Sequence, residues 1–385
     1  MSRATVRLRD VVEINPATRV GDATEKEVCF AAMADVSEAG RITSFQTRPL
    51  LEVSKGYTSF CEGDILLAKI TPCFENGKAA VVERLASSVG FGSTEFHVLR
   101  PSSKIDARFL FHLIWNPRFR SLGANRMTGS AGQKRLPTAF LAEYEFWLPQ
   151  LAEQKRIAAI LDKADSLRRK RREAIRLADE FLRSAFYEIF GDPVANNKNW
   201  GEREIAEIGK VTTGNTPSRD VDAYFGDALE WIKSDNINTA GHWLTKAREG
   251  LSELGATVAR TAPSGSTLMT CIAGSPSCIG NVAMTDRTVA FNQQINAVTP
   301  LADIEPEFVY ALLLFSKARI QATSTNSMKG MVSKGTLEKV RLIWPPVDLQ
   351  KKFVQLFKQV QRLQSRMEAA DASSFFNALQ SKILA

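Results

Sequence analysis

The sequence has few of the residues on which most metal and redox sites depend. It holds three histidines and five cysteines among 385 residues, and no two cysteines form a C-x-x-C pair. An odd number of scattered cysteines fits reduced thiols and offers neither a zinc site nor a disulfide framework. The cysteines are Cys29, Cys61, Cys73, Cys271 and Cys278.

Long apolar segments are also missing. Phe308–Phe315 is among the longest apolar runs, whereas a helix that spans a bilayer needs roughly 18 apolar residues. The first ten residues, MSRATVRLRD, have no apolar core of the kind found in signal peptides. We therefore expect a cytoplasmic protein without a membrane-spanning segment.

The remaining composition is that of a folded, mildly basic protein. Hydrophobic residues make up 44% and charged residues 24%, which is enough apolar material for hydrophobic cores. At about 100–200 residues per domain, the length suggests two or three domains. Fifty lysines and arginines against 42 aspartates and glutamates give a net charge of +8. Such a balance permits a polyanionic partner without proving one.

The chain contains an internal repeat. Gly63 matches Gly265, Phe109 matches Phe308, and the pair Gln154-Lys155 matches Gln350-Lys351, at offsets of 202, 199 and 196 residues. Loop insertions and deletions in a duplicated fold produce a drift of this kind, and the period is too long for a solenoid. Each copy is therefore expected to be one globular domain followed by one helix.

Within each half, glycine-bounded β-branched runs indicate strands, apolar residues at helical spacing indicate helices, and segments rich in glycine, serine and threonine indicate loops. The expected elements are strands 64–70 and 267–272, helices 107–115 and 307–314, and loops 127–134 and 323–334. Each half is accordingly predicted to be α/β (α+β), with an undetermined strand order.

A long helix is predicted after each globular half. Pro149 in the first half, and Pro345 with Pro346 in the second, precede segments whose apolar residues recur every three or four positions. Helices of 30 to 40 residues extend for about 50 Å, more than a compact domain needs. We predict an antiparallel intramolecular coiled coil with a pseudo-twofold repeat. The alternative is that each helix packs only on its own domain. The predicted division is 1–150, 151–192, 193–346 and 347–385.

Several segments resemble the specificity subunits of type I restriction–modification systems. LPQLAEQKRIAAILDKADSLRRKR (148–171) and FYEIFGDP (186–193) resemble the helical spacer region of that family. GDILLAKITP, GFGSTEFHVLRP, TTGNTPSRD, WIKSDNI and FNQQINAV resemble segments of its recognition domains. The resemblance covers essentially the whole chain, in the order recognition domain, helix, recognition domain, helix.

The resemblance implies a DNA-binding subunit that performs no chemistry. In this family each recognition domain binds one half of a split, asymmetric double-stranded DNA target. The helix pair sets the separation of the halves and docks two methyltransferase subunits, which restriction subunits join. S-adenosylmethionine, ATP and magnesium are then expected only on the partner subunits. The expected partner contacts lie at the repeated helical motif: Glu153, Gln154, Lys155, Gln350 and Lys351. Leu349 stands where the first copy has Glu153.

Catalytic motifs are missing from the sequence. Asn15-Pro16 lacks the second proline and the aromatic residue of an amino-methyltransferase motif. Gly77-Lys78 is followed by Ala79, without the hydroxyl that a P-loop requires. The sequence therefore favours a binding protein.

Candidate DNA contacts are basic and amide side chains in loops, because Arg and Lys pair with guanine, Asn and Gln with adenine, and cations with phosphates. In the first half they are Lys69, Thr71, Asn76, Lys78, Arg126, Gln133 and Lys134. In the second half they are Thr216, Ser218, Arg219, Lys233, Ser234, Asn292, Gln293, Gln294, Lys329 and Lys334.

Structural alternatives exist for these positions. Asn76-Gly77 is a turn sequence in its own right, Thr216–Ser218 fits a helix cap, and Asn292–Gln294 fits pairing inside the fold. Lys134 and Lys334 are predicted to occupy matching loops, with a shared phosphate role. The basic run 168–172 is interpreted as a solvated helix face or a methyltransferase-docking face in preference to a DNA contact.

Two other functions remain open. The chain fits a coiled-coil scaffold whose globular ends bind protein, although the duplicated basic loops argue against it. It also fits a specificity subunit of a modification-only or related methyltransferase system.

Overall fold

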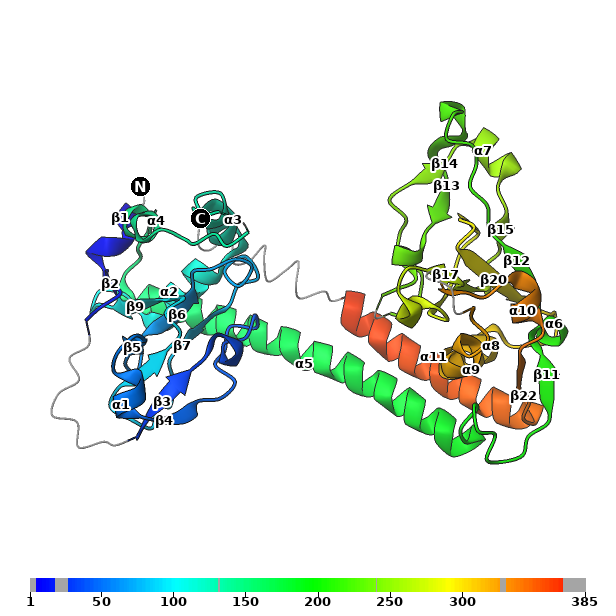
Figure 1. Cartoon of the computed structure of the whole chain (residues 1–385), viewed down its shortest axis with the longest axis horizontal. Helices are drawn as coiled ribbons and strands as arrows, with labels where there is room; N and C mark the ends of the chain where they lie inside the picture. Colours follow the sequence, from blue (N-terminus) through cyan, green and yellow to red (C-terminus); the bar gives the residue numbers. More distant parts are fainter. Residues whose placement is uncertain (1–4, 18–26, 131, 240, 326–329, 370–385) are drawn as a thin grey trace. The chain divides into compact units, whose positions relative to one another are not determined.

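The computed structural model describes residues 5–17, 27–130, 132–239, 241–325 and 330–369. The chain divides into two compact units, and the boundary between them falls within helix α5 (Figure 1). The first unit ends at Arg172 and the second runs from Glu173 to Ala369. The helix α5 (Leu151–Phe190) therefore contributes its first half to one unit and its second half to the other.

The first unit is built on two four-stranded sheets and a two-stranded ribbon. The sheet orders are β2-β9-β6-β7 and β4-β3-β8-β5, and β1 pairs with β10. All pairings are antiparallel except β3 with β8. The strands are β1 (Thr5–Arg7), β2 (Val12–Ile14), β3 (Glu27–Ala31), β4 (Gln46–Pro49), β5 (Thr58–Phe60), β6 (Ile65–Ala68), β7 (Ala79–Val81), β8 (Gly90–Gly92), β9 (Phe96–Pro101) and β10 (Glu145–Trp147). The helices are α1 (Leu50–Val53), α2 (Ala107–Trp115), α3 (Pro117–Ala124) and α4 (Thr138–Glu143), with 3-10 turns at Leu8–Asp10 and Met33–Asp35.

The second unit repeats this topology element by element. Its sheets have the orders β12-β20-β16-β18 and β14-β13-β19-β15, β11 pairs with β22, and β13 is parallel to β19. The strands are β11 (Glu202–Glu204), β12 (Gly209–Thr213), β13 (Phe225–Ile232), β14 (Gly250–Leu251), β15 (Thr261–Ala262), β16 (Thr267–Thr270), β17 (Ile272–Ala273), β18 (Val282–Met284), β19 (Val289–Phe291), β20 (Ile295–Pro300), β21 (Gly330–Met331) and β22 (Arg341–Ile343). The helices are α6 (Ile205–Ile208), α7 (Glu253–Val258), α8 (Pro306–Phe315), α9 (Lys317–Gln321), α10 (Lys334–Glu338) and α11 (Val347–Ala369), with 3-10 turns at Asp222–Tyr224, Ser234–Asn236 and Pro276–Cys278.

Hydrogen bonds place the repeat in register. Gly63 and Gly265 share a φ of +84°, which glycine adopts without strain, in the turns before β6 and β16. The isolated bridge Ile70–Arg135 of the first unit corresponds to the β17–β21 pair of the second. The internal repeat and the α/β class of both halves are thus confirmed.

The amphipathic helices α2 and α8 occupy equivalent places in the two cores. Phe109 on α2 and Phe308 on α8 are fully buried. The first half of α5 packs into the first core through Ile157 and Leu161, and α11 packs into the second through Phe353 and Phe357. Each long helix therefore contributes to the globular core that precedes it, as the alternative interpretation required.

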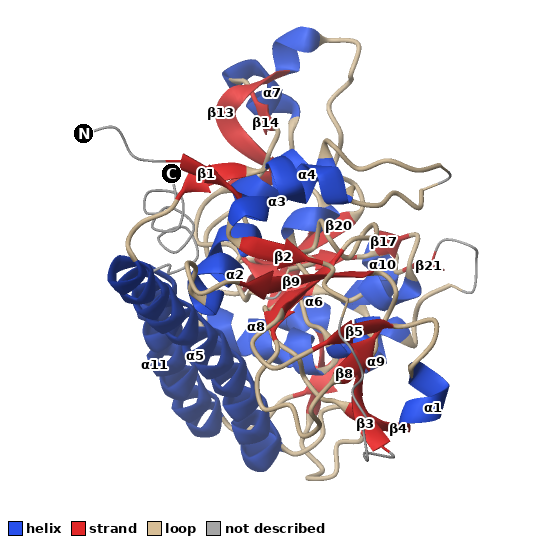
Figure 2. Cartoon of the chain, turned by 90° about the vertical axis from the view of Figure 1, so that its left-hand side faces the viewer, coloured by secondary structure: helices blue, strands red, loops and turns tan. Residues whose placement is uncertain are grey.

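The second half of α5 also packs against α11, within the second unit. The rings of Phe186 and Phe353 lie 5.4 Å apart, and Gln364 donates a hydrogen bond to Asp179 at 2.6 Å. Residues later in α11 contact residues earlier in α5, so the two helices are antiparallel. Figures 1 and 2 show them side by side. The prediction of an antiparallel intramolecular helix pair is confirmed for this part of α5.

An ion pair joins the globular part to the long helix in both units, with the charges exchanged. In the first unit Arg108 on α2 contacts Asp162 on α5. In the second, the matching positions are Glu307 on α8 and Lys358 on α11, with Lys358 Nζ 3.2 Å from Glu307 Oε1. The backbone arrangement is therefore duplicated even where the two charges of a contact are exchanged.

The helices described by the structure do not include one with the length and apolar character needed to cross a membrane.

Candidate nucleic-acid interface

In the first unit, Thr71 ties the glycine-rich loop 128–135 to the end of β6. Its Oγ1 donates to the carbonyl of Gly132 at 2.6 Å and accepts from the backbone N–H of Lys134 at 3.0 Å. The backbone of Lys69 bonds on one side to Glu95 and on the other to Leu136, at 2.9 and 2.8 Å. Lys69, Thr71 and Lys134 are thereby brought together, and the side chains of Gln133 and Lys134 are exposed.

An ion pair that was not among the predicted residues fixes the base of this loop. Arg135 makes a two-pronged contact with Glu95, with 2.7 Å between Arg135 Nη2 and Glu95 Oε1. The hydrogen bond from Arg135 lowers the pKa of Glu95, so its carboxylate stays charged. Neighbouring His97 has a pKa lowered by burial and bonds the Leu136 carbonyl at 2.9 Å. Sequence alone offered no signal for this pair, because its members lie 40 residues apart.

The other candidates of the first unit lie nearby but are less free. Asn76 is exposed, and its Nδ2 donates to Glu38 Oε1 at 2.8 Å. Lys78 donates to the carbonyl of Met33 at 3.1 Å, which uses one of its three donors. Arg126 is exposed just beyond α3. Asn76 and Lys78 therefore have structural partners as well as accessible polar atoms.

The second unit brings its candidates other than Lys329 and Lys334 together around β13 and the turn before β20. Thr216 donates to the side chain of Gln293. Ser234 Oγ lies 3.4 Å from Gln294 Oε1, which also accepts from Asn292 Nδ2 at 3.2 Å. Asn292 is buried, and its side-chain oxygen Oδ1 accepts from the backbone N–H of Gln294 at 3.1 Å. Asn292 thus shapes the turn that exposes Gln293 and Gln294.

Two cations of this cluster share one carboxylate. Glu249 accepts from Lys233 at 2.5 Å and from Arg219 at 3.0 Å, and hydrogen bonding, first from Lys233, lowers its pKa. The guanidinium of Arg219 also lies over the rings of Phe225 and Trp231, at 5.0 and 5.3 Å. Both cations are therefore paired with the same carboxylate. Ser218 is exposed beside it and contacts Asp220 at 3.4 Å.

The two clusters occupy equivalent ends of the duplicated sheets. The backbone bond from Lys69 to Glu95 in the first unit corresponds to the bond from Cys271 to Gln294 in the second. At these matched places the side chains differ: lysine against cysteine and glutamate against glutamine. Burial raises the pKa of Cys271 to about 12, so the thiol stays protonated. The two units therefore share the backbone hydrogen bonds at these positions but differ in the side chains that the positions carry.

The predicted equivalence of Lys134 and Lys334 is wrong. The backbone bond from Leu136 to Lys69 corresponds to that from Val332 to Cys271, so Lys134 matches Gly330. Lys334 matches Thr138 instead, since each is the first residue of a short helix. Lys334 is half-exposed and lies 3.6 Å from Glu338. The cause is the difference in residue number between matching positions of the two copies, which is 199 at Phe109 and Phe308 but 196 at Leu136 and Val332. Lys329 lies outside the described residues.

The helical motif predicted to contact partners is partly internal. Gln154 and Gln350 are buried, and each donates from Nε2 to the carbonyl of a preceding proline, at 2.9 and 2.8 Å. Their amides tie the first turns of α5 and α11 to the proline segment that precedes each helix, and burial removes them from any partner surface. Lys155 and Lys351 are exposed, and Glu153 is partly exposed and paired with Arg156 at 2.7 Å.

Within the parts of the chain that the structure describes, histidine, cysteine, aspartate and glutamate side chains form no group of three or more suited to holding a metal ion.

Comparison with known proteins identifies the family. The model of the type I restriction modification DNA specificity domain matches residues 3–177 and again residues 197–371. The specificity subunit of the type I restriction enzyme EcoEI from Escherichia coli is 42% identical over 162 residues, which is 41% of this chain and 27% of that protein. The EcoAI specificity subunit, from the same species, is 43% identical over 152 residues, 39% of this chain and 26% of that protein. These matches span only about a quarter of the length of either relative.

A solved structure shows the same fold. The crystal structure of the type I restriction–modification system S subunit from M. genitalium gives a TM-score of 0.60 at 13% identity, and covers 99% of this chain and 96% of that one. The family model, which matches most of the residues in both halves, establishes descent. The chain therefore belongs to the type I restriction–modification DNA specificity family and carries the family's domain twice.

Proposed function

We propose that this chain is the non-catalytic DNA-recognition subunit of a type I restriction–modification complex. Each recognition domain, residues 1–150 and 193–346, binds one half of a bipartite and asymmetric target in double-stranded DNA. The observation that carries this proposal is the pair of equivalent loop clusters, which share one backbone frame but present different side chains. Two similar domains with different polar surfaces are suited to two different half-sites.

The chemistry of these clusters is that of groove recognition. Exposed amides such as Gln133 and Gln293 are suited to adenine, and cations such as Lys134 and Arg219 to guanine or phosphate. In the first unit we propose Lys69, Asn76, Lys78 and Arg126 as further contacts. In the second, Thr216, Ser218, Lys233, Ser234, Gln294, Lys329 and Lys334 fill this role. Thr71 and Asn292 act by holding the loops that carry the others.

The long helices have a separate role in this proposal. The segments 151–192 and 347–385 set the distance between the half-sites and dock two methyltransferase subunits, which restriction subunits join. The exposed side chains of Lys155 and Lys351, with Glu153 beside them, contribute to that docking. S-adenosylmethionine, ATP and magnesium belong to the partner subunits, and the complex works in the cytoplasm.

Adenine-methylation mapping tests the proposal. The chain is co-expressed with its methyltransferase partner in a host without adenine methylation, and the methylated motif is mapped across the genome. We expect a split motif. Replacing residues 196–346 with the corresponding segment of a relative should change one half of the motif and leave the other half unchanged.

Four results would contradict it. A contiguous motif, or a replacement that changes both halves, would show that the units do not recognise separate half-sites. Methylation by the purified chain alone would show that it is an enzyme. Co-purification of the partner without any DNA protection would favour the scaffold function.

A further inference from the structure

An arginine-lined cavity lies in the first unit, and none of the predicted DNA contacts is among the residues that line it. It has a volume of about 620 Å³ and lies between α2, α5 and the segments that flank β7. Four arginines line it, against the two carboxylates of Glu83 and Asp162. The arginines are Arg41, Arg84, Arg108 and Arg169.

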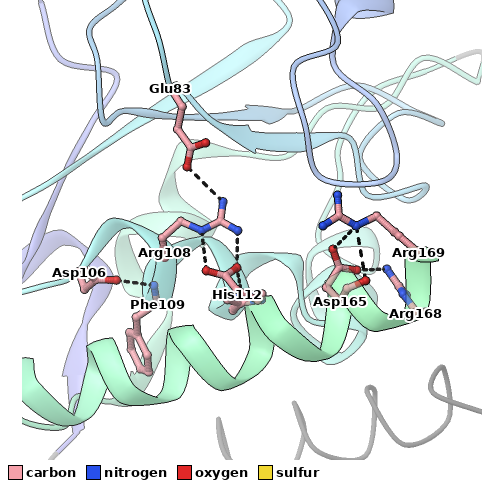
Figure 3. A network of polar contacts seen from close by, with 9 residues as sticks. Glu83, Asp106, Arg108, Phe109, His112, Asp165, Arg168 and Arg169 are labelled. Atoms are coloured by element: carbon pink, nitrogen blue, oxygen red, sulfur yellow. Dashed lines mark hydrogen bonds and ion pairs between the residues drawn. The ribbon is translucent and has the colours of Figure 1, made fainter. Parts of the chain in front are cut away.

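Two of these arginines are held in place by carboxylates. Arg108 donates from Nε to Asp162 at 3.1 Å and lies 3.6 Å from Glu83. Arg169 lies 3.0 Å from Asp165 (Figure 3). Such contacts fix the planes of the guanidinium groups without using all five N–H donors of each. The cavity therefore has positioned donors in its wall.

The other two arginines are uncompensated. Arg41 and Arg84 are exposed, and among the described residues neither side chain has an ion-pair partner. Arg84 has a φ of +60°, in the left-handed region where glycine is the unstrained choice. The Glu62 carboxylate holds this conformation by accepting from the backbone of Arg84 and Leu85, at 2.8 and 2.6 Å. These bonds fix the backbone from which the Arg84 side chain lines the cavity.

The second copy lacks this cluster. Thr43 and Thr245 make the same pair of bonds to the carbonyls of Asp35 and Asn236, so Arg41 matches Trp243. By the same register, Glu307 matches Arg108 and Ser365 matches Arg169. Arg287 does match Arg84, but it is paired with Glu230 at 2.7 Å. The concentration of arginines is therefore a property of one unit and not of the shared frame.

The cavity adjoins a candidate DNA-binding loop. Asn76 bonds Glu38, three residues before Arg41. On the other side of the loop, Trp115 donates from Nε1 to the carbonyl of Gly77 at 3.0 Å. The segment 38–45 thus links the loop around Asn76 to the cavity. Duplex DNA bound at that loop would carry its sugar–phosphate backbone toward the arginines.

We propose that this cavity binds a backbone phosphate of the duplex recognised by the first unit. Arg41 and Arg84 donate to the phosphate, and Arg108 and Arg169 help to orient it. The inference rests on the proposed DNA-recognition function. Guanidinium groups match the phosphate geometry with paired hydrogen bonds. A contact of this type positions the protein on DNA without selecting sequence.

The test is the salt dependence of DNA binding by the complex with the methyltransferase partner. The double variant R41Q/R84Q is compared with the wild type on a duplex that carries the mapped target, from 50 to 300 mM salt. Loss of one phosphate contact should lower the slope of log K against log salt by about 0.9. Affinity should fall about tenfold, with an unchanged methylation motif. R118Q, which removes an exposed arginine of α3 outside the cavity, should leave slope and motif as in the wild type.

Each other outcome contradicts the inference. An unchanged slope in R41Q/R84Q, with normal binding by the wild type, overturns the phosphate site and leaves DNA recognition standing. An unchanged slope with lower recovery of the methyltransferase assigns the cavity to an acidic protein surface. An altered motif assigns it to base recognition. Absence of duplex binding by the wild-type complex overturns both proposals. Thermal unfolding of the variant verifies that the first unit remains folded.

Discussion

Gln364 on α11 donates a 2.6 Å hydrogen bond to Asp179 on α5, and this contact joins the two long helices inside the second unit. Gln364 also lies 3.3 Å from the carbonyl of Ile175 and is buried. The same oxygen of Asp179, Oδ1, also lies 3.0 Å from Nε2 of His242, and His242 bonds the hydroxyl of Tyr310 at 2.8 Å. The Asp179 carboxylate is partly exposed, whereas Gln364 and Tyr310 are buried, so the network runs from the helix surface into the second core.

The first prediction concerns this contact. Gln364→Ala should lower the free energy of unfolding of the chain by about 1–2 kcal/mol, because it removes a buried side chain and its hydrogen bond to the partly exposed carboxylate of Asp179. Denaturant unfolding measures the change. Gln359→Ala, at an exposed position of the same helix, should change stability by less than about 0.5 kcal/mol. Equal effects of the two substitutions would rule out a special role for the Gln364 contact.

The second prediction concerns the two buried glutamines that hold the starts of the long helices. Gln154→Ala and Gln350→Ala should each cost about 1–3 kcal/mol, because the proline carbonyl that accepts from Nε2 becomes unpaired inside the protein. Lys155→Ala, next to Gln154 but exposed, should leave the unfolding midpoint nearly unchanged. A larger loss of stability in Lys155→Ala than in Gln154→Ala would refute the structural role of this hydrogen bond.

The third prediction concerns acid stability. Burial raises the pKa of Asp162, but hydrogen bonds from His112 and Arg108 outweigh that effect and lower it from 3.8 to about 2. Because the folded-state pKa is depressed, this contribution is fully present above about pH 4. It is lost as the pH falls from about 4 to 2. With a discount for partial exposure it amounts to about 1–2 kcal/mol. Unfolding of Asp162→Asn between pH 2 and 6 should show a flatter pH dependence, and an unaltered profile would contradict it.

The fourth prediction uses the exchanged charges. Asp162→Lys should destabilise the first unit by about 2–4 kcal/mol, because Arg108 then faces a like charge in a half-buried site. Adding Arg108→Glu restores an opposite pair in the arrangement of Lys358 and Glu307, and should recover at least half of the loss. Lys163→Asp reverses an exposed charge on the same helix and serves as control. A double variant no more stable than the single variant would contradict the equivalence.

The fifth prediction concerns the spacing of the half-sites. Four residues inserted between 165 and 176 lengthen α5 by about 6 Å. Because a turn holds 3.6 residues, the part of α5 after the insertion is rotated by only about 40° from its original orientation about the helix axis. The unrecognised spacer of the methylated motif should grow by one or two base pairs, at about 3.4 Å each. Two inserted residues turn the helix by about 200° and should abolish methylation. Methylome sequencing decides, and an unchanged spacer would refute the role of α5 in spacing.

Much of the fold was predictable from the sequence, because the internal repeat gives the same apolar spacing at two places in the chain. The helix at 107–115 has the predicted bounds, and the apolar spacing after Pro149 corresponds to α5. The parallel pairing of β3 with β8 was not predictable, since strands of three to five residues carry too little pattern to specify a neighbour.

The site was predicted less completely. Sequence motifs indicated residue types in loops, but the partners that fix those loops, such as Glu95 and Arg135, are distant in the chain. Gln154 illustrates the same limit, because a repeated polar residue is expected both at a partner contact and at an internal hydrogen bond. Only its burial distinguishes the two. Likewise, a three-residue change in loop length moved Lys134 and Lys334 out of equivalence.

The reversed ion pairs restrict how such chains can be rearranged. If a globular half were exchanged by recombination without its own helix, α8 would bring Glu307 against Asp162, or α2 would bring Arg108 against Lys358. Either combination places like charges at a junction that must close for the core to form. Viable chimaeras should therefore carry crossover points beyond the first turns of the long helix, so that each lobe is inherited together with the part of the helix on which it rests.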